Sequence, residues 1–166
     1  MKNKKMLILV AAALIVVIAV IVVVALPKKE YTDVHSSSEI YEQIKGSFVT
    51  EGGTKILDSD VILDFCDDEP DYLVDYTVVK ANNAKNINEI GIFKVENGKA
   101  EEFVSYIKAY VESTQQRYRA MDYFPEEVEK INCATYKIFG NYVVYSFLNE
   151  SDTNAFYSAF EALIQK

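Results

Sequence analysis

The chain has 166 residues, with 17 basic and 25 acidic side chains and a formal net charge of −8. Half of the residues are hydrophobic and 13% are aromatic, a composition that excludes an intrinsically disordered chain. All of the acidic residues but only 14 of the basic ones follow residue 26, so a nucleic-acid partner is not expected.

An uninterrupted apolar segment, residues 6–26, opens the chain and contains no polar side chain. As a helix, its 21 residues would span about 31 Å, close to the thickness of a bilayer core. We therefore predict a single transmembrane signal-anchor helix in the plasma membrane. Because Lys2, Lys4 and Lys5 precede it, residues 1–5 are expected to be cytoplasmic and the rest of the chain extracytoplasmic.

A cleavable signal peptide is the alternative interpretation of this segment. Small or tolerated residues would allow cleavage after Ala25, and the mature protein would then be secreted. The apolar run is longer than the usual signal-peptide core of about 7–15 residues, which favours the anchor.

The next residues, 27–36, are expected to form a short linker, and the only histidine, His35, lies there as a solvated side chain. Ser36 and Glu39 have the spacing of a capping box, in which each side chain bonds the backbone of the other. This motif and the apolar spacing after it predict a helix over residues 37–48.

The middle of the chain combines an acidic connector with two strands. Residues 58–71 are rich in acidic side chains, with a short helix or strand expected at 60–65. Residues 72–80 and 89–95 are rich in β-branched and aromatic residues and predict a hairpin with a long loop.

The second half repeats this helix and hairpin order. The predicted elements are a helix over 98–121, a short helix with Pro125 in its first turn, strands over 133–139 and 142–148 around Gly140-Asn141, and a helix over 152–165.

This order predicts an α+β domain over residues 37–166 in the arrangement α-ββ-α-ββ-α. We expect two layers, with an antiparallel sheet of about four or five strands and helices on one face. The uncovered face could then display a tyrosine-rich patch for a partner, because Tyr72 and Tyr76 share one side of their strand and Tyr136 and Tyr145 lie in the second hairpin. The alternative is that these tyrosines are ordinary strand aromatics.

Eight carboxylates between Asp58 and Asp75 raise the possibility of a calcium site, with Asp58, Asp60 and Asp64 as candidate ligands. The EF-hand spacing fails, because Ile62 occupies the next ligand position. We favour a solvated acidic loop and predict neither a metal nor a cofactor.

The two cysteines, Cys66 and Cys133, could form a disulfide outside the membrane or remain two buried thiols. No histidine of the predicted domain could activate either one as a nucleophile.

Motifs of known enzyme classes are absent from the sequence, including phosphate-binding loops, nucleophile elbows and zinc-ligand spacings. The leading hypothesis is a non-enzymatic binding module that meets a protein or envelope component near the membrane. The first alternative is a hydrolase or transferase acting on an envelope substrate through carboxylates such as Asp64 and Asp75. The second is a structural subunit of a membrane complex, in which the span itself binds the partner.

Four segments resemble a bacterial family common in Firmicutes, the domain of unknown function numbered four-three-five-eight. They are residues 90–95 (IGIFKV), 116–118 (QRY), 123–128 (YFPEEV) and 140–144 (GNYVV). The resemblance covers about residues 34–165 and implies an extracytoplasmic domain on a lipid or a single-span anchor. This chain fits the single-span form, and the family has no established activity.

The resemblance singles out Arg117, Tyr118, Tyr123 and Pro125, which fall at the end of the long helix. They could form a ligand site. The simpler interpretation is a structural corner, with a basic residue at a helix C-terminus and a proline that starts the next turn.

Overall fold

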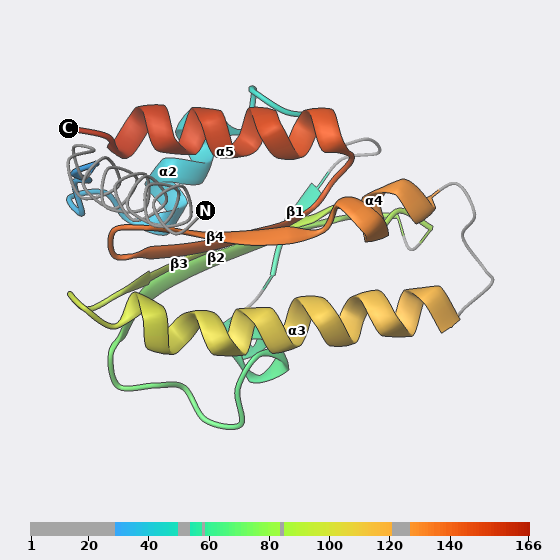
Figure 1. The fold of residues 1–166 in the computed structure, drawn as a ribbon, viewed down its shortest axis with the longest axis horizontal. Helices are drawn as coiled ribbons and strands as arrows, with labels where there is room; N and C mark the ends of the chain where they lie inside the picture. Colours follow the sequence, from blue (N-terminus) through green and yellow to red (C-terminus); the bar gives the residue numbers. More distant parts are fainter. Residues whose placement is uncertain (1–28, 50–53, 58, 84, 121–126) are drawn as a thin grey trace, which may run out of the picture.

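The computed structural model describes residues 29–49, 54–57, 59–83, 85–120 and 127–166 (Figure 1). The apolar segment predicted to span the membrane, residues 6–26, lies outside these ranges. Within the described residues, no helix combines the length and the apolar character needed to cross a bilayer.

A five-stranded antiparallel sheet forms the centre of the domain, with the strand order β1-β2-β3-β5-β4. The strands are β1 Thr54–Ile56, β2 Leu73–Ala81, β3 Glu89–Val95, β4 Thr135–Phe139 and β5 Tyr142–Phe147. The predicted α+β class and strand number are therefore confirmed. Both predicted hairpins are present, and β3 and β5 join them into one sheet.

The helices follow the predicted order, including the short element expected at 60–65 and the short helix after the long one, while the short strand β1 was not predicted. The helices are α2 Ser37–Ile44, the 3-10 helix η1 Ser59–Asp64, α3 Ala100–Ala120, α4 Val128–Cys133 and α5 Glu150–Ile164. The capping box at the start of α2 is confirmed, since the Ser36 hydroxyl accepts from the Glu39 amide and the Glu39 carboxylate accepts from the Ser36 amide.

The prediction that helices cover one face of the sheet is wrong, because α2 and α5 cover one face and α3 covers the other (Figure 1). The physical reason lies in the central strands. Every residue of β5 is buried, which requires a partner layer on each side of the strand. A sheet with a solvated face would show polar residues at alternate positions instead.

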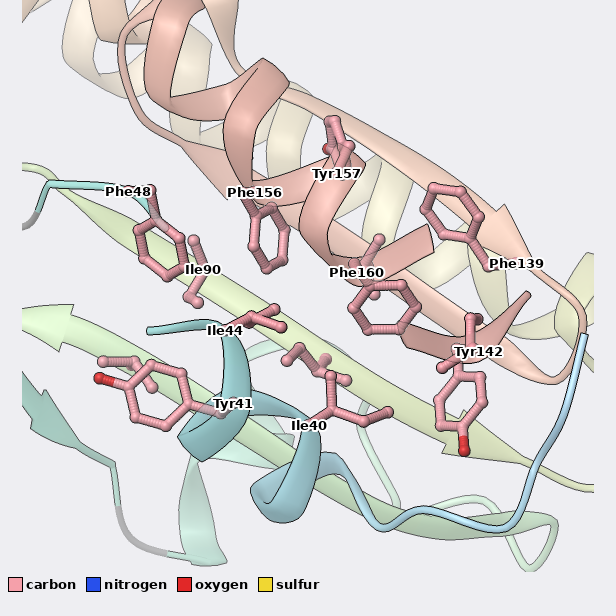
Figure 2. Close-up of a cluster of buried hydrophobic side chains, with 14 of the residues drawn as sticks. Ile40, Tyr41, Ile44, Phe48, Ile90, Phe139, Tyr142, Phe156, Tyr157 and Phe160 are labelled. Atoms are coloured by element: carbon pink, nitrogen blue, oxygen red, sulfur yellow. The ribbon is translucent and has the colours of Figure 1, made fainter. Parts of the chain in front are cut away.

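The first core, between the sheet and the α2 and α5 helices, is largely aromatic. In Figure 2 the rings of Phe156 and Phe160 point from α5 toward the strands, while Ile40 and Ile44 come from α2. The Phe160 ring centroid lies 5.6 Å from that of Tyr142 on β5. The burial of these apolar side chains away from water is the main source of stability in such a domain.

The second core, between the sheet and α3, is centred on Phe93 of β3. The centroid of its ring lies 5.0 Å from the ring centroid of Phe65, 5.2 Å from that of Phe103 on α3 and 6.1 Å from that of Tyr145 on β5. Tyr145 is fully buried here. The predicted tyrosine patch on an open sheet face is therefore also wrong, because α3 covers that face.

The two ends of the domain are built from different elements. At the termini end lie the Gly140-Asn141 turn, the start of α3 and the C-terminal end of α5 (Figure 1). At the opposite end, here called the α4 end, lie α4, the first residue of β3, Glu89, and the first residue of α5, Glu150 (Figure 1).

Candidate functional site

Two of the four residues that the family resemblance singled out, Arg117 and Tyr118, lie toward the α4 end. Arg117 and Tyr118 occupy the last turn of α3, with the guanidinium carbon 5.5 Å from the centre of the Tyr118 ring. Tyr123 and Pro125 lie outside the described residues. In the same turn of α3 as Arg117 and Tyr118, the Arg119 guanidinium donates to Asn132 Oδ1 at 3.2 Å, which ties α3 to α4.

The two tyrosines predicted to mark a binding face take part in packing. Tyr72 lies beneath the Lys99 ammonium, 4.9 Å from its ring centroid, and contacts the edge of Phe103. Burial and the nearby Glu102 carboxylate raise the pKa of Tyr72 to about 12. Tyr76 stacks on Phe93. Neither ring belongs to an open aromatic surface.

The acidic candidates do not converge. Asp58 lies outside the described residues, and in the rest of the described chain no three His, Cys, Asp or Glu side chains could hold a metal ion together. The Asp75 carboxylate accepts the Ser37 amide at 2.7 Å, on the α2 side of the sheet. Asp64 ends η1, on the α3 side, so the acid pair suggested for catalysis is not brought together.

Both cysteines are free thiols in the structure. Cys66 is buried in the core beneath α3, and its thiol donates to the Ile62 carbonyl at 3.5 Å. Cys133 is partly exposed at the last residue of α4. Burial raises the pKa of both thiols, so neither has the low pKa of a reactive cysteine.

A buried carboxylate that the sequence analysis did not identify dominates the interior of the α4 end. Glu89 is 4% exposed. Its Oε1 accepts the hydroxyls of Tyr110 and Tyr145, each at 2.6 Å, and its Oε2 lies 2.6 Å from the Lys80 ammonium. These groups join β2, β3, β5 and α3, and we call them the Glu89 network.

Strand register explains how the Glu89 network assembles. Glu89 faces Lys80 directly across the β2–β3 pair, and Gly91 faces Tyr145 across the β3–β5 pair. A Cβ atom at Gly91 would lie 2.1 Å from Cε1 of Tyr145 and 2.8 Å from the Phe93 ring. The missing side chain is therefore what allows the Tyr145 ring to lie across β3 and reach Glu89.

The Glu89 network is built to hold charge inside the fold. Burial, followed by the negative charge of Glu89, raises the pKa of Tyr110 and Tyr145 above the ordinary value of 10. Both phenols therefore stay protonated and act as donors. With two hydroxyls and an ammonium on one carboxylate, the buried charge is paired and hydrogen-bonded as stability requires.

A second buried ion pair secures α4. The Lys130 ammonium lies 2.9 and 2.8 Å from the two Glu127 oxygens, and both residues are at least 90% buried. Glu127 Oε2 also accepts the Ile87 amide at 3.0 Å, while Lys130 reaches Asn86 Oδ1 at 3.4 Å. The pair thus fixes α4 to the connection between β2 and β3.

Parts of these two groups left a signal in the sequence. Glu89 is in phase with Phe93 and Val95, so it occupies an inward position of a strand. Glu127 and Lys130 have the spacing of neighbours on a helix surface. Pairing Glu89 with Lys80 and Tyr145 required the strand registers, which a single sequence does not supply.

Together these features define an α+β domain with a doubly covered antiparallel sheet and a polar network buried at one end. Residues 63–148, just over half of the chain, match the model of a family described as Domain of unknown function (DUF4358), and the chain belongs to this family. No curated protein and no solved structure matches the chain. The matched segment runs from η1 to just past β5, so it contains the Glu89 network and the Glu127–Lys130 pair.

Proposed function

We propose that this protein is an extracytoplasmic interaction module, held at the plasma membrane by residues 6–26 and binding a protein or another component of the cell envelope. The observation that carries the proposal is the way the chain enters the domain. The segment that follows the apolar stretch is fastened to the C-terminal residues from Lys29 onward.

Backbone bonds make this fastening. The Thr32 amide donates to the Ile164 carbonyl at 2.8 Å, the Lys166 amide donates to Glu30 at 3.0 Å, and Tyr31 and Gln165 form a β-bridge. The residues described within the predicted linker, 29–36, are therefore packed against the domain.

Side chains reinforce the same attachment. Glu161 of α5 accepts from the Lys29 ammonium at 2.6 Å and from the Tyr31 hydroxyl at 2.8 Å. Farther along, the His35 carbonyl accepts from the Tyr142 hydroxyl at 2.7 Å and from Lys94 at 3.1 Å. Bonds to β3, β5 and α5 therefore hold the entering segment.

This attachment has a geometric consequence for a tethered domain. Between the end of the apolar stretch and Glu30 lie only residues 27–29, which reach at most about 11 Å when extended. A body fastened so closely would keep its termini end at the bilayer. The α4 end would lie a strand length farther out, about 23 Å for the seven residues of β3.

The alternatives differ in what supports them. The alternative of a hydrolase or transferase relied on carboxylates such as Asp64 and Asp75. These two lie on opposite sides of the sheet, so we do not propose this alternative. A structural subunit that binds through its span would respond differently when that span is replaced. Replacing residues 6–26 with an unrelated span of equal length would abolish its function, whereas a module that binds through its domain would keep it.

Thiol labelling in intact cells tests the arrangement. In a Cys133→Ser background, we expect Glu129→Cys, exposed at the α4 end, to react with a membrane-impermeant maleimide. Lys4→Cys should react only after permeabilisation. A domain labelled at Glu129→Cys only after lysis would contradict the proposal.

Span exchange then separates the two binding modes. A photo-crosslinking residue at position 129 should give the same adduct in the native chain and in the chain with an unrelated span. Loss of that adduct on span exchange, in a protein still labelled at Glu129→Cys, would favour the structural subunit.

A further inference from the structure

The turn between β3 and α3 carries the only Asn-Gly pair of the sequence, Asn97-Gly98. It lies at the termini end, where α3 begins (Figure 1). In such a pair the backbone nitrogen of the glycine can attack the side-chain amide of the asparagine, because glycine has no Cβ to obstruct the approach. Whether the pair reacts in a folded protein depends on how the fold holds the two groups.

The Asn97 side chain is free to take part. It is exposed, and its amide group forms no hydrogen bond with any residue that the structure describes. Other asparagines of the chain are held in place. The Asn141 amide group donates to Asp33 at 3.2 Å, and that of Asn149 donates to Asp152 at 2.8 Å. No hydrogen bond of the described fold therefore has to break before the Asn97 side chain can turn toward the backbone.

The backbone amide of Gly98 is free as well. Gly98 is exposed, and no described residue accepts a hydrogen bond from its N–H. The amides on either side are used by the fold, since that of Glu96 donates to the Tyr72 carbonyl at 2.9 Å and that of Lys99 donates to the Glu96 carbonyl at 3.0 Å. The Gly98 nitrogen can thus act as a nucleophile without leaving a bond of the domain unmade.

The turn around these two groups is lightly held. Gly98 has a φ of 80°, and a hydrogen bond from Lys99 to Glu96 closes the turn, which is the pattern of a type II turn with glycine at its third position. Opening one exposed hydrogen bond slows a reaction by about tenfold or less. The folded chain should therefore keep much of the reactivity that the same pair has in a free peptide.

We propose that Asn97 is a site of spontaneous deamidation in the native protein. A base removes the proton of the Gly98 N–H, and the nitrogen bonds to Cγ of Asn97. The bond from Cγ to the side-chain nitrogen breaks, and that nitrogen takes up a proton and leaves as ammonia. Water, the only co-reactant, then opens the cyclic imide. Attack at Cγ gives aspartate, whereas attack at the main-chain carbonyl of residue 97 gives isoaspartate.

Both products change the start of α3. Each adds one negative charge to the termini end, and isoaspartate also adds one carbon atom to the main chain between β3 and α3. The reaction needs only the turn and water, so it does not rest on the membrane attachment. Either proposal can therefore fail without the other.

Peptide mapping by mass spectrometry tests the site on the full chain, incubated in detergent micelles at mildly alkaline pH. Cleavage after Phe93 and Phe103 isolates Asn97 as the only asparagine of residues 94–103. A synthetic peptide of the same residues, incubated alongside, gives the rate without the fold. We expect the folded chain to convert at no less than about one-tenth of the peptide rate. Slower conversion, or none, would overturn the proposal.

Two controls identify the reacting group. Asn154 is exposed too, but it lies inside α5, where backbone amides are bonded to carbonyls four residues back, and we expect it to stay unchanged. Asn97→Gln lengthens the side chain by one methylene and requires a larger ring, so residues 94–103 of this variant should not convert. Conversion of Asn154 as fast as that of Asn97, or an unchanged conversion in the Asn97→Gln chain, would contradict the assignment.

Discussion

Gly91→Ala is expected to destabilise the domain by about 3 kcal/mol or more. The new methyl group would lie 2.1 Å from Cε1 of Tyr145, a distance that no packing tolerates. The ring must move away, which strains the core and takes the Tyr145 hydroxyl from Glu89. Urea unfolding followed by circular dichroism should show the lower free energy of unfolding. Thermal unfolding should give a melting temperature lower by about 10 °C.

The chain provides a matched control for this substitution. Among the described residues, no atom beyond Gly46 and its chain neighbours lies within 4 Å of where a Cβ at Gly46 would stand, so Gly46→Ala should change stability by less than about 0.5 kcal/mol. In a Tyr145→Leu background, Gly91→Ala should cost less, because the closer of the two rings that the new methyl group meets is gone and only the Phe93 ring remains. Equal urea-unfolding midpoints for the Gly91→Ala and Gly46→Ala proteins would show that the Tyr145 ring does not lie over β3.

Glu89→Gln should cost about 2–3 kcal/mol, the second largest effect that we expect. The amide cannot pair with the Lys80 ammonium as a carboxylate does, and it is a poorer acceptor for the two buried hydroxyls. Lys80 is one-third exposed and can turn toward solvent, so the effect stays below that of breaking a fully buried pair.

Two comparisons isolate the network contribution in the same urea experiment. Tyr110→Phe removes one donor and should cost about 1 kcal/mol. Glu129→Gln, at an exposed position of α4, should cost less than about 0.5 kcal/mol. If Glu89→Gln were as mild as Glu129→Gln, the Glu89 network would not contribute to stability.

The order of the elements could be predicted because each left a local signal. The Ser36 and Glu39 capping box, the Gly140-Asn141 turn and the apolar stripe of α3 depend on residues close in sequence. The number of layers was mispredicted although evidence for it was present. The near-continuous run of apolar and aromatic residues in β5, interrupted by Ser146, indicated burial on both sides, and that would have ruled out an open face.

Site residues were harder to predict, because buried polar groups depend on contacts between distant elements. Glu89 meets Tyr145 from a strand 56 residues away, and Lys130 meets Asn86 across 44 residues. Tyr72 and Tyr76 were singled out because the chain is rich in tyrosine, yet both side chains pack against the core beneath α3. The fastening of Tyr31 to Gln165 is equally non-local, and no pattern in residues 27–36 indicated it.

Fluorescence quenching in liposomes gives the most direct test of the central claim, that the termini end of this domain is held against the membrane. The full chain, in a Cys133→Ser background, carries a fluorophore at Asn97→Cys on the termini end or at Glu129→Cys on the α4 end, both exposed positions. A chain with a long Gly/Ser insertion between residues 27 and 28 serves as the control. We expect a headgroup quencher to act strongly at position 97 and weakly at 129, with the difference lost after insertion; equal quenching at the two positions in the native chain would contradict the account.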